Sequence, residues 1–212
     1  NASRIVLADT IELVTSHASQ ALLNNAASVG GDSVEVSVGN VSIVGVVRTF
    51  ENFGGTSLES TTLGSSFNVS NDIALSSGGA GTNIAGAALV TLLHPLYPQQ
   101  REGESSIIPT IYVDGTVLSE AENTITNPED SPYELRIPGG SVAAAAAAAS
   151  ESIDTVCRFW DTATQSFSTR GVTTISSSAT SGIVCHSTHL TVFSASSKTK
   201  LAVNTIEASD IS

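Results

Sequence analysis

The stretch VEVSVGNVSIVGVV at residues 34–47 decides the fold class, because the hydrophobic period of the chain changes here to that of a β-strand. From Val34 to Val38, valines alternate with polar residues, which is typical of a half-buried strand. The Gly39-Asn40 pair predicts a turn, and the apolar run after it predicts a second strand. Within that run, Gly45 indicates a β-bulge. The stretch therefore predicts two successive strands at the start of a β-rich region.

Upstream of this stretch, the N-terminal segment has the period of an α-helix. Apolar residues recur every three or four positions, as on one face of a helix, at Leu7, Ile11, Val14, Ala18 and Leu22. The Gly30-Gly31 pair after the last turn predicts the end of the helix. We therefore predict a helical lead-in over residues 1–30.

Downstream, short strands and turns follow one another. Residues 133–137 alternate apolar and charged side chains, which predicts a clear strand. Residues 107–113 predict another strand, which Pro109 would place at a sheet edge. The run 84–93 fits either a strand or a short helix. One helix followed by many short strands is typical of a β-sandwich, so we predict a mostly β fold with an N-terminal helix, the sandwich spanning residues 31–196.

The composition narrows the classes of function. The chain has 212 residues and a net charge of −12, with 8 Lys and Arg against 20 Asp and Glu. This balance argues against nucleic-acid binding and against docking on anionic membranes. No apolar run reaches the roughly 20 residues of a membrane span. Abundant Ser and Thr, few Lys and two cysteines fit the outside of a cell, and the missing initiator Met suggests a processed chain or a fragment.

Other sequence features are weaker. Three N-glycosylation sequons, at Asn1, Asn40 and Asn68, agree with an extracellular chain, although chance sequons are expected in a sequence rich in Ser and Thr. The four histidines lack metal-ligand spacing, and two cysteines do not form a usual structural zinc site, so we expect no metal and no cofactor. Seven alanines at residues 143–149 fit a tolerated surface insert.

The chemistry of the chain is concentrated near His189, Leu190 and Thr191. Histidine can act as a base near neutral pH, and a threonine hydroxyl beside a base is a competent nucleophile. The nearest electrophile is the Leu190 carbonyl carbon, and attack there would be an N-to-O acyl shift followed by hydrolysis of the ester. The spacing alone is a weak signal, because it arises by chance in many chains.

The residues around this triplet resemble the GPS motif, the proteolysis site of GAIN domains in adhesion receptors and polycystin-type membrane proteins. The resemblance covers residues 157–196, whose tail TVFSAS is more similar to the polycystin branch. The matching positions, in chain order, are Cys157, Phe159, Trp160, Ser168, Gly171, Cys185, His189, Leu190, Thr191 and Phe193.

This resemblance also implies a disulfide and supporting residues. Receptor-type motifs carry four cysteines in two bridges, and here Val172 and Ser187 stand at the positions of one bridge. The resemblance therefore implies a disulfide between Cys157 and Cys185, with two buried free thiols as the alternative. The resemblance further implies that three other positions of the motif support the core: Trp160, Phe193 and Gly171.

The function that the resemblance implies is a single self-cleavage between Leu190 and Thr191. The chain would be a domain similar to GAIN subdomain B, on the extracellular face of a plasma or ciliary membrane. Its partners would be its own segment from Thr191, other domains of the same membrane protein, or channel subunits. Residues 197–212 would lead to a membrane span beyond Ser212. The alternative is a structural or adhesive module that never cleaves; an ordinary hydrolase would need a catalytic set that the sequence lacks.

Overall fold

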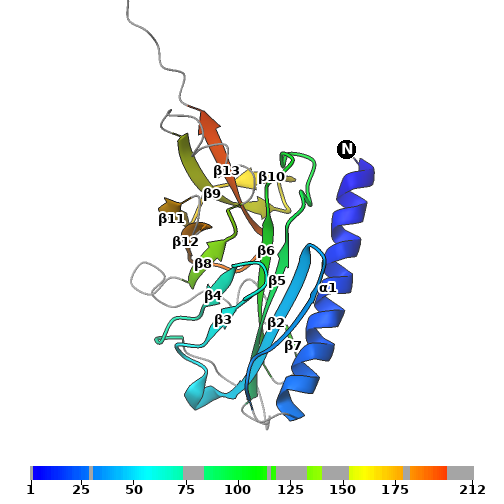
Figure 1. Ribbon diagram of the computed structural model, residues 1–212, viewed down its shortest axis with the longest axis vertical. Coiled ribbons are helices and arrows are strands. Elements are labelled where there is room, and N and C mark those ends of the chain that lie inside the picture. The colour runs from blue at the N-terminus through cyan, green and yellow to red at the C-terminus, as the bar shows by residue number, and fades with distance from the viewer. Residues whose placement is uncertain are drawn as a thin grey trace, which may run out of the picture.

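A computed structural model describes residues 2–28, 31–73, 84–113, 116–117, 133–139, 153–178 and 182–199. The fold is mostly β, with two antiparallel sheets packed face to face and one N-terminal helix (Figure 1). The predicted fold class, a β-sandwich with an N-terminal helix, is therefore confirmed. The alanine run at 143–149 and the sequon at Asn1 lie outside the described residues.

The larger sheet has the strand order β1-β2-β5-β6-β13-β9-β10, and β7 pairs with the far end of β6. Its strands are β1 (Val34–Val38), β2 (Val41–Thr49), β5 (Ile84–Leu92), β6 (Ser106–Val113), β7 (Thr116–Val117), β9 (Ile153–Asp161), β10 (Ser166–Ser168) and β13 (Phe193–Thr199). The ambiguous run 84–93 is thus a strand. Its apolar residues are buried on both faces, which explains why no alternation marks it.

The smaller sheet has the order β11-β12-β8-β4-β3. Its strands are β3 (Ser57–Glu59), β4 (Ser66–Asn68), β8 (Tyr133–Ile137), β11 (Val172–Ser178) and β12 (Gly182–Ser187), and a short 3₁₀ helix, η1 (Phe50–Asn52), precedes β3. The predicted strand at 133–137 is confirmed as β8, whose apolar residues point into the core and whose charged residues point out. The core between the sheets includes side chains from both, such as Phe67, Leu135, Phe159 and Phe193.

Helix α1 (Ala2–Ser28) packs on the outer face of the larger sheet, over β2 and β5 (Figure 1). The expected bulge at Gly45 is wrong, because β2 pairs with β1 and β5 in an unbroken register. Gly45 instead lets the helix approach: a Cβ there would come within 3.3 Å of the Leu22 and Leu23 side chains. Gly86 of β5 has the same role, with Leu23 at 3.2 Å. No helix in the described part of the chain is both long and apolar enough to cross a bilayer.

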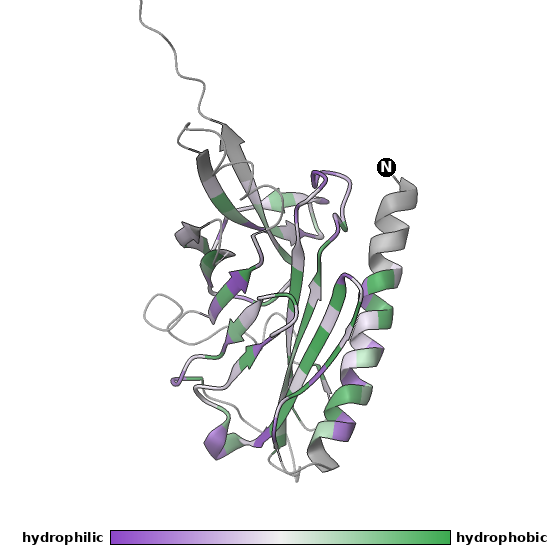
Figure 2. Ribbon diagram, viewed as in Figure 1, coloured by the Kyte–Doolittle hydropathy of each residue, from purple (hydrophilic) through white to green (hydrophobic). Residues whose placement is uncertain are grey.

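The buried face of α1 differs from the predicted one. Val14 is 61% exposed, whereas Thr15 and Ser19 are buried, so the prediction is wrong at Val14. The two hydroxyls donate to helix carbonyls, Thr15 to Ile11 and Ser19 to Thr15, and can therefore be buried at little cost. Apolar residues consequently do not form one continuous stripe on the helix (Figure 2).

Strand β6 is internal, so the expectation that Pro109 marks a sheet edge is wrong as stated. One side of β6 pairs with β5 along its whole length. The other side pairs with β13 at Ser106 and Ile107 and with β7 at Tyr112 and Val113. Among the described strands, none pairs with the stretch between, so Pro109 lies where the sheet is locally open on one side.

A single carboxylate connects the two sheets at the β1 edge. Glu35 of β1 accepts hydrogen bonds from the hydroxyls of Ser37, Ser42, Ser60 and Thr61 and from the backbone N–H of Thr61. Partial burial raises the pKa of Glu35, but these hydrogen bonds outweigh it and lower the pKa from 4.5 to about 2. The loop between β3 and β4 is thereby tied to the larger sheet.

Glu35 is expected to make stability depend on pH. Because its pKa is lowered on folding, its contribution is complete above pH 4.5 and is lost as the pH falls toward 2. The carboxylate is partly exposed, so we expect Glu35→Gln to cost about 1–2 kcal/mol at pH 7 and almost nothing near pH 2. Urea unfolding at both pH values measures this, with Glu59→Gln, an exposed carboxylate on β3, as the matched control. An equal cost of Glu35→Gln at both pH values would contradict the assignment.

Candidate self-cleavage site

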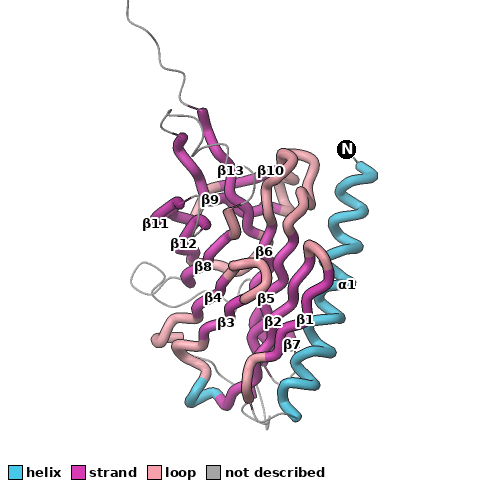
Figure 3. The backbone as a smooth tube through the Cα atoms, in the orientation of Figure 1, coloured by secondary structure: helices cyan, strands magenta, loops and turns pink. Residues whose placement is uncertain are grey.

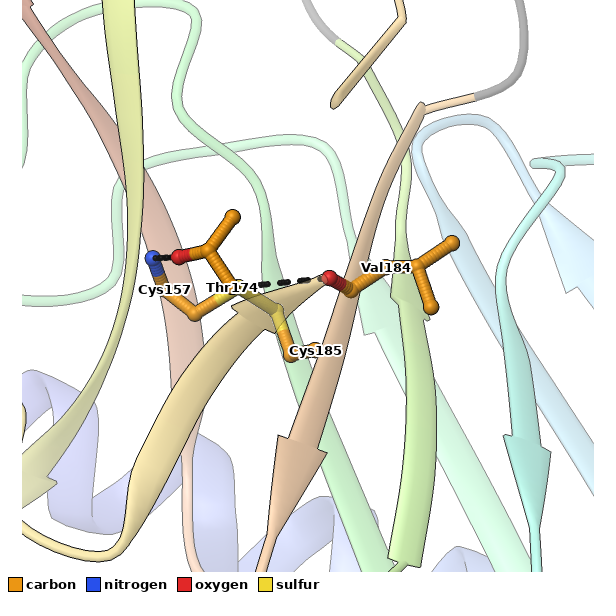
Figure 4. Close-up of a disulfide and its surroundings, with 4 residues drawn as sticks. All are labelled: Cys157, Thr174, Val184 and Cys185. Carbon is orange, nitrogen blue, oxygen red and sulfur yellow. Dashed lines mark hydrogen bonds between the residues drawn. A yellow bond between two sulfur atoms is a disulfide. The ribbon is translucent and has the colours of Figure 1, made fainter. Parts of the chain in front are cut away.

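A disulfide joins the two sheets next to the motif. Cys157 of β9 and Cys185 of β12 are bonded, with their Cα atoms 6.0 Å apart, and both are buried (Figure 4). The Cys157 N–H also donates to the Thr174 hydroxyl of β11 at 2.9 Å, and its sulfur lies 3.8 Å from the Val184 carbonyl oxygen. The structure thus contains the pairing that the resemblance implied rather than two free thiols. The bridge fixes the end of β12 that leads into the triplet.

The triplet lies in the short connection between β12 and β13, which crosses from the smaller sheet to the larger one. Before it, the Ser187 hydroxyl donates to the His189 carbonyl oxygen at 2.8 Å. After it, the Trp160 N–H donates to the Val192 carbonyl oxygen at 2.9 Å. The Leu190 side chain is buried between the sheets, whereas that of Val192 is buried on the outer face of the larger sheet. The Leu190–Thr191 peptide bond is therefore held from both sides.

Two aromatic rings and a glycine position the His189 side chain. Its imidazole packs edge-on against Phe159, with ring centroids 4.3 Å apart, and lies 5.9 Å from the Phe193 ring centroid. Gly171 has a φ of +73° and lies so close that a Cβ there would meet the Thr188 hydroxyl at 2.8 Å and the His189 Nδ1 at 3.3 Å. Gly171 is exposed, so it supports the imidazole at the surface rather than the core.

The Thr191 hydroxyl donates to the Trp160 carbonyl oxygen at 3.4 Å, a long and therefore weak hydrogen bond. Within the described residues, this connection has no cis peptide bond and no non-glycine residue with a positive φ. Rotation of the Thr191 side chain would break the weak bond to Trp160 at small cost.

His189 also borders a pocket with a volume of about 390 Å³ that opens to solvent. Its walls include Phe159, Trp160, Arg170 and Gly171. Water in this pocket can therefore reach His189.

The structure also describes the two aromatic residues expected in the core and two of the three sequons. Trp160 is buried on the outer face of the larger sheet, and Phe193 is fully buried between the sheets. Asn40 is exposed in the β1–β2 turn, with its amide nitrogen 2.7 Å from His94 Nε2. Asn68 is half-buried on β4, and its amide donates to Glu134 at 2.8 Å, so a glycan there would have to displace this bond.

Sequence reasoning missed the packing of the loop at residues 93–105, which covers the outer face beside the triplet. Tyr97 of this loop stacks on Trp160, with ring centroids 3.9 Å apart and planes 14° from parallel. Pro95 and Pro98 exclude a helix interior and therefore predict a loop over residues 94–99. A contact between residues 63 positions apart, however, leaves no spacing signal. A lone aromatic residue between two prolines was the only available hint.

No protein-family model matches this chain, and a comparison with curated proteins found no match.

Proposed function

We propose that the chain is an extracellular GAIN-like domain of a larger polycystin-type membrane protein that cleaves itself once between Leu190 and Thr191. The observation that carries the proposal is that His189, Leu190 and Thr191 occupy the anchored connection into β13, beside the disulfide. The other domains of the same protein, or channel subunits at a plasma or ciliary membrane, are its proposed partners.

In the proposed reaction, the Thr191 hydroxyl oxygen attacks the Leu190 carbonyl carbon while His189 takes the hydroxyl proton. The C–N bond then breaks, the proton passes to the leaving amine, and an ester joins Leu190 to the Thr191 side chain. Water from the neighbouring pocket hydrolyses the ester to a Leu190 carboxylate and a restored hydroxyl. The fixed positions on both sides of the peptide bond lower the entropic part of the barrier.

After cleavage, the two pieces would stay together without a covalent link. Both cysteines precede Leu190 in the chain, so the disulfide does not join the pieces. Strand β13 pairs with β9 from Phe193 to Thr199 and with β6 at its first two residues, and Phe193 is fully buried. A strand held in this way leaves only slowly, which makes the site a non-covalent joint between an outer region and a membrane-anchored one.

The purified chain itself tests the proposal. Intact mass under denaturing conditions is expected to give the two pieces 1–190 and 191–212, and native gel filtration is expected to give one species. Hydroxylamine should speed cleavage, because it attacks an ester but not an amide. Thr191→Ala is the matched control and should remain a single chain. A single intact mass for the unmodified chain, with or without hydroxylamine, would favour the non-cleaving structural module instead.

A further inference from the structure

The strand that would follow the cleavage point is held unequally by its two neighbours. Strand β13 pairs with β9 along its whole length, from Phe193 to Thr199. Its other neighbour, β6, pairs with only Phe193 and Ser194. The side of β13 toward β6 is therefore secured only near the new end of the chain, and whatever strengthens that short contact controls how β13 detaches.

A buried glutamine reinforces this short contact. The Gln100 side-chain amide donates to the hydroxyls of Ser106 on β6 and Ser194 on β13, both at 2.9 Å. These two serines are paired across the strands, and both are fully buried. Gln100 is 6% exposed, so its amide bridges the two strands in the absence of competing water.

The other end of the same side chain fixes the loop that carries it. The side-chain oxygen of Gln100, Oε1, accepts hydrogen bonds from the backbone N–H groups of Leu96 and Tyr97, at 2.6 and 2.7 Å. Further along the loop, buried Glu104 forms an ion pair with Arg158 of β9. The loop 93–105 is thus closed on itself and attached to β9, the strand on the far side of β13.

The loop also reaches the residues immediately after the cleavage point. Tyr97 stacks on Trp160, and the backbone of Trp160 bonds both the Thr191 hydroxyl and the Val192 carbonyl. Leu96 and Val192 belong to the same buried cluster. In Figure 3 this loop joins β5 to β6 at the end of the sheet next to β10. Its side chains therefore cover the first residues of the segment that cleavage would create.

We propose that the loop 93–105 is a clasp that retains the cleaved segment, with Gln100 as the bond that must break before β13 can leave β6. This inference rests on the proposed function, because retention matters only if the chain is cut. The clasp sets how readily the joint opens, whereas His189 and Thr191 set whether it is cut. Retention and cleavage should then respond to different substitutions.

The test compares release and cleavage in the same samples. The chain is immobilised by an N-terminal tag, and release of the piece 191–212 into buffer is followed by mass spectrometry. Ser194→Ala removes one buried hydrogen bond and is expected to speed release about tenfold. Gln100→Leu removes both strand bonds and the loop closure and should speed release further, while the fraction of cut chains stays unchanged. The double variant should be no faster than Gln100→Leu.

Gln99→Leu is the matched control. Gln99 is the neighbouring residue and is exposed, and its side chain hydrogen-bonds to the β9–β10 hairpin: it donates to the Gln165 carbonyl oxygen and accepts from the Phe167 N–H. It should leave release unchanged. Equal release rates for Ser194→Ala, Gln100→Leu and the unmodified chain would overturn the clasp.

Amide hydrogen exchange separates failure of the clasp from failure of the proposed function. If the chain proves uncut, the proposed function fails, but the clasp still predicts faster exchange at residues 193–196 in Gln100→Leu and Ser194→Ala than in Gln99→Leu. Unchanged exchange at these residues would exclude a retaining role for Gln100 whether or not the chain is cut.

Discussion

Replacement of His189 by alanine is expected to slow cleavage at Leu190–Thr191 by at least about 100-fold, because the Thr191 hydroxyl loses its base. The imidazole borders a pocket that opens to solvent, so added imidazole can enter the space that the substitution leaves. We therefore expect imidazole to restore cleavage to His189→Ala but not to Thr191→Ala, which lacks the nucleophile. A time course of the two pieces on a denaturing gel measures both effects.

His186→Ala is the matched control for this experiment. His186 lies three residues earlier on β12, on the outer face of the smaller sheet, with its Nε2 3.6 Å from a Glu134 carboxylate oxygen. The His186→Ala chain should cleave itself at the rate of the unmodified chain. Rapid cleavage of His189→Ala, or equal losses in the two variants, would show that His189 is not the base.

The sequence predicted the elements whose side chains alternate between core and solvent. Strand β8 is the clearest example, since each of its buried positions is apolar and each outward position is charged. The buried face of α1 could not be predicted in this way, because the packing positions Thr15 and Ser19 are polar residues that bond to their own helix. Gly45 was misleading for a related reason: its role depends on the helix above it, which no local pattern reports.

The order of the strands in the sheets was harder to predict from the sequence than the strands themselves. Strand β13 lies between β6 and β9, although about 80 residues separate it from β6 in the chain. No hydrophobic periodicity in the sequence indicates that β13 and β6 are neighbours. The triplet and the two cysteines could be singled out because their spacings resemble those of a known motif. Gln100 could not, because its importance arises from burial beside Ser106 and Ser194 after the strands have met.

Removal of the disulfide is expected to have the largest effect on stability. The bridge closes a loop with a sequence separation of 28, and the loop-entropy estimate gives a contribution of about 3.5 kcal/mol. Cys157 and Cys185 lie in opposite sheets, so the unlinked chain must also find the face-to-face packing of β9 and β12 without this constraint. For a domain of this size, such a loss is a large fraction of the net stability.

The measurement is urea unfolding of Cys157→Ala/Cys185→Ala, followed by the fluorescence of Trp160, the single tryptophan. Trp160 is buried against Tyr97 and should report the loss of the larger sheet. All variants carry Thr191→Ala, so that every molecule unfolds as one continuous chain. Reduction of the unmodified bridge by a thiol should reproduce most of the loss, because it removes the link without removing the sulfur atoms. A change below about 1 kcal/mol in both experiments would mean that packing alone holds the sheets together, and the bridge would then serve only to position the connection that contains His189.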